Sequence, residues 1–165
     1  MDGWTPFHLA AREGDVEIMS TLLQTNSRAI DTASSNGRTA LHTASLHGRF
    51  EAVKLILQNF NAANMKTDSC GNLPIMDSVR AGSIEILDFL ANLSPGSINQ
   101  KDILSRNCLH VAAESGQDNI VQHLIQNHGM APNDNSSLTT PLHWAAKEGQ
   151  AKVIVTLLSY GANPQ

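Results

Sequence analysis

The sequence predicts an all-α solenoid in which five helix-turn-helix units stack side by side, with short β-hairpin-like turns between them. A glycine recurs with steps of 34, 34, 34 and 33 residues, at Gly14, Gly48, Gly82, Gly116 and Gly149. Six residues before it lies a histidine in four units and a methionine in the third. A fixed period of this length is typical of repeat architectures, whose units bury their apolar faces only against neighbours.

The period divides the 165 residues into five units that leave no interdomain linker. The units are 2–35, 36–69, 70–103, 104–136 and 137–165. We therefore expect one array over 1–165. Its last predicted helix, KVIVTLLSYG (152–161), is apolar enough to need a neighbour, and GANPQ follows where another turn would start. The array is thus expected to be a segment of a longer one, or to associate through its ends.

The first helix of each unit is expected to begin after a capping residue and to end at the recurring glycine. A side chain that can accept a backbone N–H lies at Thr5, Thr39, Asn107 and Thr140. Proline, which suits the first helical position, follows at Pro6, Pro74 and Pro141. Unit three has Leu73 at the capping position and Met76 in place of histidine, so we expect it to keep the fold with a weaker first helix.

The second helix of each unit is predicted from an apolar stripe with helical spacing. In unit four the stripe is Ile120, Val121, Leu124 and Ile125. In unit two it includes Phe50, Val53 and Leu57, and in unit three Ile84, Ile86, Leu87 and Leu90. Turn residues follow the helix, as in YGANP (160–164), and separate one unit from the next.

The repeated phrases TPFHLAAREG (5–14), TALHTASLHG (39–48) and TPLHWAAKEG (140–149) resemble the ankyrin repeat pattern T-P-L-H-x-A-A-x-x-G. The resemblance spans the whole chain and implies the ankyrin fold with a non-enzymatic function in protein–protein interaction. It also implies that the recurring histidines bond backbone groups of their own turn and of the neighbouring unit. These histidines are His8, His42, His110 and His143.

A metal-binding or catalytic role for these histidines is disfavoured by the predicted stacking. Equivalent residues of neighbouring units should lie roughly 8–10 Å apart, whereas two ligands of one zinc ion lie about 3–3.5 Å apart. No phosphate-binding loop, C-x-x-C pair or G-x-S-x-G motif is present. Cys108 could have a lowered thiol pKa in a first helical turn, but it would need a histidine partner. We therefore expect no enzyme activity, no cofactor and no metal.

The composition of the chain disfavours several classes of partner and of location. The net charge of −4 and the 16% of charged residues disfavour a nucleic-acid or membrane partner. No apolar run approaches the roughly 20 residues that span a bilayer, and no signal peptide follows Met1. The two cysteines, Cys70 and Cys108, form no disulfide framework. A cytoplasmic location, with the nucleus as a second compartment, is therefore expected.

Two columns of residues vary between units and are candidates for partner binding. The column before each cap contains Trp4, Arg38, Asn72, Arg106 and Thr139. The column two residues before each recurring glycine contains Arg12, Leu46, Arg80, Glu114 and Lys147. Five of these ten residues are basic, which predicts a basic strip that favours an acidic partner surface. The alternative is that ankyrin repeats often carry a basic residue in the second column for reasons unrelated to a partner.

A third column, which follows the histidine position, is expected to meet water. It contains Leu9, Thr43, Asp77, Val111 and Trp144. The tryptophans of these columns are either anchors for a partner or side chains that pack on their own turns. The predicted binding groove accordingly consists of Trp4, Arg12, Arg38, Leu46, Arg80, Arg106, Trp144 and Lys147.

A narrower resemblance, to one cytosolic and nuclear member of the family, implies an alternative function. It implies that alanyl-tRNA synthetase is the partner and that lysine side chains accept misactivated serine, which limits mischarging. The lysines of this chain are Lys54, Lys66, Lys101, Lys147 and Lys152. None lies in a motif that marks an acceptor, so no lysine is assigned this role.

Overall fold

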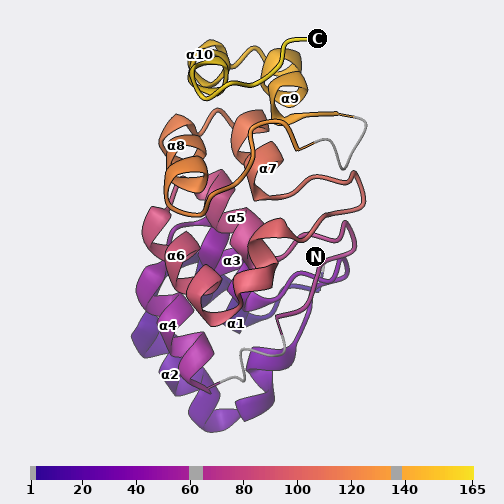
Figure 1. The fold of residues 1–165 in the computed structure, drawn as a ribbon. Helices are drawn as coiled ribbons and strands as arrows, with labels where there is room; N and C mark the ends of the chain where they lie inside the picture. The colour runs from indigo at the N-terminus through magenta and orange to yellow at the C-terminus, as the bar shows by residue number, and fades with distance from the viewer. Residues whose placement is uncertain (1–2, 60–64, 135–138) are drawn as a thin grey trace.

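A computed structural model describes residues 3–59, 65–134 and 139–165 (Figure 1). These residues form five pairs of α-helices, one in each predicted unit, which confirms the all-α repeat fold. The pairs are α1 (Pro6–Glu13) with α2 (Val16–Thr25), α3 (Ala40–Leu46) with α4 (Phe50–Asn59), α5 (Pro74–Ala81) with α6 (Ile84–Leu93), α7 (Cys108–Glu114) with α8 (Asp118–Gln126), and α9 (Pro141–Lys147) with α10 (Ala151–Ser159). Two 3₁₀ helices, Ser27–Asp31 and Pro95–Asn99, follow α2 and α6.

The pairs stack in chain order and form two layers (Figure 1). The first helices α1, α3, α5, α7 and α9 pack on one another in sequence, and the second helices α2, α4, α6, α8 and α10 lie beside them. A small residue two positions after the histidine position is buried in every unit and lets neighbouring helices approach closely. These residues are Ala10, Ala44, Ser78, Ala112 and Ala145.

The core is aliphatic, as the apolar stripes predict. Ile120, Val121 and Leu124 of α8 are fully buried, and the equivalent face of α6 buries Ile86 and Leu90. Removal of this apolar surface from water is the main favourable term in folding. Each unit contributes its stripe to a single continuous cluster, so no unit has a core of its own.

Unit three keeps the fold despite its departures from the pattern. Its first helix is eight residues long, as is α1, although Leu73 offers no capping side chain. Met76, in the place of the histidine, is fully buried. Gly82 ends the helix in the left-handed region with φ 72°, which a residue without Cβ adopts without strain. The expected weakness of this helix stays a prediction.

The hairpin-like turns are closed by backbone hydrogen bonds. The N–H of Ser34 donates to the carbonyl of Arg38 at 2.8 Å, and Asp68 and Asn72 form the same bond at 3.0 Å. In the described residues the only β-type pairing is an isolated antiparallel bridge between Ala33 and Thr39, so the turns do not build a sheet. No helix in these residues combines the length and apolar character needed to cross a lipid bilayer.

Candidate functional site

The recurring histidines join each unit to the next. In unit two the backbone N–H of Thr39 donates to Nδ1 of His42 at 3.2 Å, and Nε2 of His42 lies 3.0 Å from the carbonyl oxygen of Asn72 in unit three. His8 and His110 make the equivalent inter-unit contacts at 3.1 and 3.0 Å. An Nδ1 that accepts and an Nε2–H that donates require a neutral ring. Both backbone contacts implied by the resemblance are therefore confirmed for these three histidines.

His143 makes the contact within its own unit but not the contact with a neighbouring unit. Its Nδ1 lies 2.8 Å from the hydroxyl of Thr140 and 3.3 Å from the Thr140 nitrogen. Within the described part of the chain it has no unit beyond it to supply a carbonyl, and its side chain is exposed. His8, His42 and His110 are instead fully buried.

The column after the histidine position is partly buried, contrary to expectation. Thr43, Asp77 and Val111 are at most 2% exposed. Leu9 of the first unit is 50% exposed, and Trp144 of the last unit is half-buried. The expectation of contact with water therefore fails for the three inner units.

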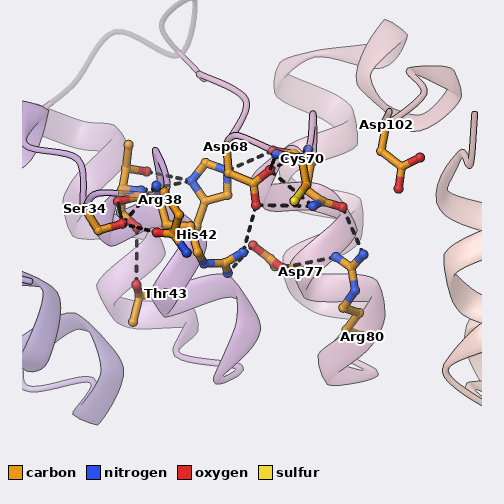
Figure 2. Close-up of polar contacts among 12 residues, drawn as sticks. Ser34, Arg38, His42, Thr43, Asp68, Cys70, Asp77, Arg80 and Asp102 are labelled. Carbon is orange, nitrogen blue, oxygen red and sulfur yellow. Dashed lines mark hydrogen bonds and ion pairs between the residues drawn. The ribbon is translucent and has the colours of Figure 1, made fainter. Parts of the chain in front are cut away.

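Asp77 lies at the centre of a largely buried ion-pair network between α5 and the turns that precede α3 and α5 (Figure 2). Arg38 of unit two donates from Nη2 to Asp77 at 2.7 Å and from Nη1 to Asp68 at 3.1 Å. Arg80 completes the network, with Nη1 3.3 Å from Asp77 and Nη2 2.9 Å from Oδ1 of Asn72. Two guanidinium groups and two carboxylates thus neutralise one another across the boundary between units two and three.

The pKa values of the two carboxylates of this network are shifted in opposite directions. Burial raises the pKa of Asp77 to about 6, although Arg38 and Arg80 act to lower it. Burial also acts to raise the pKa of Asp68, but hydrogen bonds from the N–H groups of Asn72 and Cys70 outweigh it and hold the pKa below its usual value. Asp68 is therefore the stable anion of the pair.

Arg106 is held in a second network in unit four. Its Nε lies 2.8 Å from Asp102, and its Nη1 lies 2.6 Å from Glu114. Asp102 also accepts the backbone N–H groups of Leu104 and Arg106, both at 2.9 Å, so the same carboxylate shapes the turn and binds the cation. Arg106 is only 8% exposed.

Three of the five basic residues of the predicted strip are therefore not free positive charges, and a role of the strip in binding stays a prediction. Arg38, Arg80 and Arg106 are bound to carboxylates of their own chain. Charge bound in this way has little left to offer a partner. The sequence did contain a signal for this internal pairing, because the carboxylates Asp68 and Asp102 recur at one period of 34 residues.

The other predicted groove residues are more open. Arg12 is exposed and pairs with Glu13 at 2.9 Å, while Leu46 is half-buried. Trp4 is half-buried and packs its ring 5.9 Å from that of His8, which agrees with a side chain that packs on its own turn. The groove role of these residues stays a prediction.

Trp144 lies between two cations at the last unit boundary. The guanidinium carbon of Arg106 is 5.0 Å and Nζ of Lys147 is 4.6 Å from the ring centroid. The indole N–H donates to the hydroxyl of Thr139 at 3.1 Å. Trp144 is thus positioned by contacts with its own chain, and its half-buried ring keeps part of its surface in solvent.

Sequence reasoning missed an exposed apolar pair where unit three ends at Ile103 and unit four begins at Leu104, here named the turn tip of unit four. Ile103 is 69% and Leu104 53% exposed. The same positions hold Ser35 and Asn36 in the turn between units one and two, so a comparison at the repeat period would have found the pair. Ser105 beside it has φ 60°, a left-handed conformation uncommon outside glycine.

Sequence reasoning also missed a cluster of Asp88 on α6, His123 on α8 and His128 just after α8, because none belongs to the repeated phrase. The Nε2 atoms of both histidines lie close to one carboxylate oxygen of Asp88, at 2.7 and 2.8 Å.

Cys108 is fully buried, and burial raises its thiol pKa to about 12. It is therefore not an activated nucleophile.

Comparisons with known proteins agree with the repeat geometry. A family model described as ankyrin repeats (3 copies) matches residues 1–68 and 75–165. Mouse rabankyrin-5 is 29% identical over 98% of this chain, and chicken nuclear factor NF-kappa-B p105 subunit is 30% identical over 97% of it. The chain spans only 14% and 16% of the length of these two relatives.

Among solved structures, the human ASB11 ankyrin repeat domain superposes with a TM-score of 0.79 at 23% sequence identity. The match covers 97% of this chain and 71% of that one, and it shows the shared fold. Ankyrin repeat domains are typically protein–protein interaction modules and are generally non-catalytic. The histidine joints, the stacked helix pairs and the family match together place this chain in the ankyrin repeat family.

Proposed function

We propose that this chain is a protein-binding module whose main contact is the turn tip of unit four, formed by Ile103 and Leu104. The observation that supports it is the exposure of two adjacent aliphatic side chains, 69% and 53%, where the neighbouring turns carry small or polar residues. Exposed apolar surface of this kind is costly in water and is typical of interaction sites. The Ile103 amide is held by the carbonyl of Cys70 at 3.1 Å, so the tip is positioned before binding.

A second candidate contact surface is formed by Trp144 and Lys147 in unit five. Aromatic residues that are partly exposed and already positioned are frequent energetic anchors of interfaces. Because Arg38, Arg80 and Arg106 are internally paired, we propose that apolar contact contributes more to affinity than attraction to an acidic partner.

The test replaces the tip with the residues of the turn between units one and two, as Ile103→Ser with Leu104→Asn. This change copies a turn that the same fold already contains, so the helices should be retained. Val155→Ser on α10 is the matched control, because Val155 is 66% exposed and apolar but lies in the outer layer. We expect a partner captured from cell lysate to be reduced at least tenfold by the tip variant and unchanged by the control. Capture that is insensitive to the tip would refute the proposal.

A second candidate is the serine-accepting co-regulator of alanyl-tRNA synthetase. It is supported by the resemblance of DGWTPFHLAAREGD (2–15), LHTASLHGRFEAVKLIL (41–57) and LHWAAKEG (142–149) to the later repeats of ankyrin repeat domain-containing protein 16. That resemblance also carries the cytoplasmic and nuclear location. The side chains of Lys147 and Lys152 are 65% and 79% exposed, so their amines are accessible to an activated ester.

In this reaction the lysine amine would attack the carbonyl of seryl-adenylate, an amide would form and AMP would leave. Intact-mass measurement after incubation with serine, ATP and the synthetase tests it. Added seryl mass that disappears in a Lys147→Arg, Lys152→Arg double variant supports the acceptor role. An unmodified chain that still binds the synthetase supports the binding module alone.

A further inference from the structure

Two imidazoles and a carboxylate meet on the layer of second helices, separate from the turn tip of the proposed binding surface. Asp88 comes from α6, His123 from α8, and His128 from the segment that follows α8. One ligand atom from each residue lies within 4.8 Å of the other two. The two rings approach edge to face, with centroids 5.3 Å apart.

The three residues are held in place by the repeat fold. Asp88 and His123 lie on α6 and α8, whose Leu87 and Leu124 are fully buried, so packing fixes the helices that carry these two residues. His128 precedes a tight turn in which the N–H of Met130 donates to the carbonyl of Leu124 at 3.1 Å. Ligands fixed in advance reduce the entropy cost of binding an ion.

We propose that Asp88, His123 and His128 form a Zn²⁺ site that links units three and four. Two imidazole nitrogens and one carboxylate oxygen are ligands that zinc prefers, whereas calcium and magnesium prefer oxygen alone. Zinc–ligand bonds of about 2.0–2.2 Å place tetrahedral ligands roughly 3.3 Å apart. The present distances of 2.7 and 2.8 Å therefore need to open by roughly half an ångström.

The most exposed of the three side chains has the most room for this adjustment. The side chain of Asp88 is 38% exposed, compared with 16% for His123 and 21% for His128. A cavity of about 280 Å³ adjoins His128 and is also lined by Pro95 and Asn99. In zinc sites with three protein ligands a water commonly takes the fourth position, and this is the coordination proposed here.

The test is titration of the metal-free chain with Zn²⁺ by isothermal calorimetry. The background is Cys70→Ser, which removes the exposed thiol as a competing ligand. We expect one ion per chain, with a Kd of about 10 μM or tighter. Asp88→Asn keeps an oxygen that can accept the imidazole N–H groups but removes the anionic ligand, so it separates coordination from hydrogen bonding. It should weaken binding at least tenfold, as should His128→Gln.

His47→Gln is the matched control, because His47 is exposed at the end of α3, outside the cluster. It should bind zinc as the parent does. Co²⁺ supplies an independent readout, since a tetrahedral site gives intense visible absorption that Asp88→Asn should abolish. Circular dichroism establishes that each variant is folded. No saturable binding by the parent chain, or equal binding by the Asp88→Asn and His128→Gln variants, would overturn the proposal, and neither result bears on the turn tip.

Discussion

Acidification should destabilise this protein through His42. The ring is fully buried, with Nδ1 bonded to Thr39 and Nε2 to the carbonyl of Asn72. Burial lowers the pKa of His42 to about 4, and Arg38 adds to this effect, whereas the Asn72 carbonyl opposes it. A proton therefore binds more tightly to the unfolded chain, where the ordinary pKa is 6.5, than to the folded one.

The sign and size of the effect follow from this difference. Because the pKa is lower in the folded state, the contribution of His42 is present above pH 6.5 and is lost as the pH falls toward 4. A separation of 6.5 minus 4, at about 1.4 kcal/mol per pKa unit, corresponds to about 3 kcal/mol between pH 7 and pH 4. Burial lowers the pKa of His8 and His110 as well, so both act in the same direction.

Urea denaturation at a series of pH values, with the wild type and His42→Gln, measures this contribution. The variant should be less stable at pH 7, because it loses the bonds to Thr39 and Asn72. Its stability should nevertheless fall by about 3 kcal/mol less than that of the wild type between pH 7 and pH 4. Other titrating groups, including Asp77, are common to both proteins and cancel in the comparison. Parallel pH profiles, or an NMR titration of the His42 ring near 6.5, would refute the reasoning.

Three further predictions concern burial and backbone geometry. Arg38→Met should lower the free energy of unfolding by about 3 kcal/mol, because it leaves Asp77 buried without its nearest cation; a loss below 1 kcal/mol in urea denaturation would contradict the role of the ion pair. Gly82→Ala should cost about 1–2 kcal/mol by the same assay, since its φ of 72° strains any residue with a Cβ, and an unchanged midpoint would contradict this. Iodoacetamide at neutral pH should label the exposed Cys70 and spare the buried Cys108, so two labels on the folded chain by intact mass would disprove the burial of Cys108.

The within-unit features were predicted correctly because they depend on neighbours in the chain. Helix starts at Thr5 and Thr39 and the helix end at Gly82 follow from local capping and backbone preferences. The contacts of His42 also follow from the resemblance, since its partners are Thr39 three residues away and Asn72 in the next copy of the same unit.

The contacts of the variable columns were predicted less well. Thr43 and Asp77 were expected in water because they are polar, yet both are buried. The environment of such a residue depends on the direction of its side chain between stacked helices. A polar residue type does not predict this direction, because a buried polar group can be satisfied by an ion pair or a hydrogen bond. The ion pairs in turn removed most of the free charge from the predicted strip.

The period of the sequence, taken alone, determined the unit, the number of units and the residues that join them, because a repeated local pattern repeats its own local structure. Only the tertiary structure decided which charges pair and which side chains converge. Arg38 and Asp77 are 39 residues apart, and Asp88 lies 35 and 40 residues from its two histidines, so none of these separations equals the 34-residue period. Such contacts arise from the offset between stacked helices, which is set by how neighbouring side chains pack and not by the pattern within a unit.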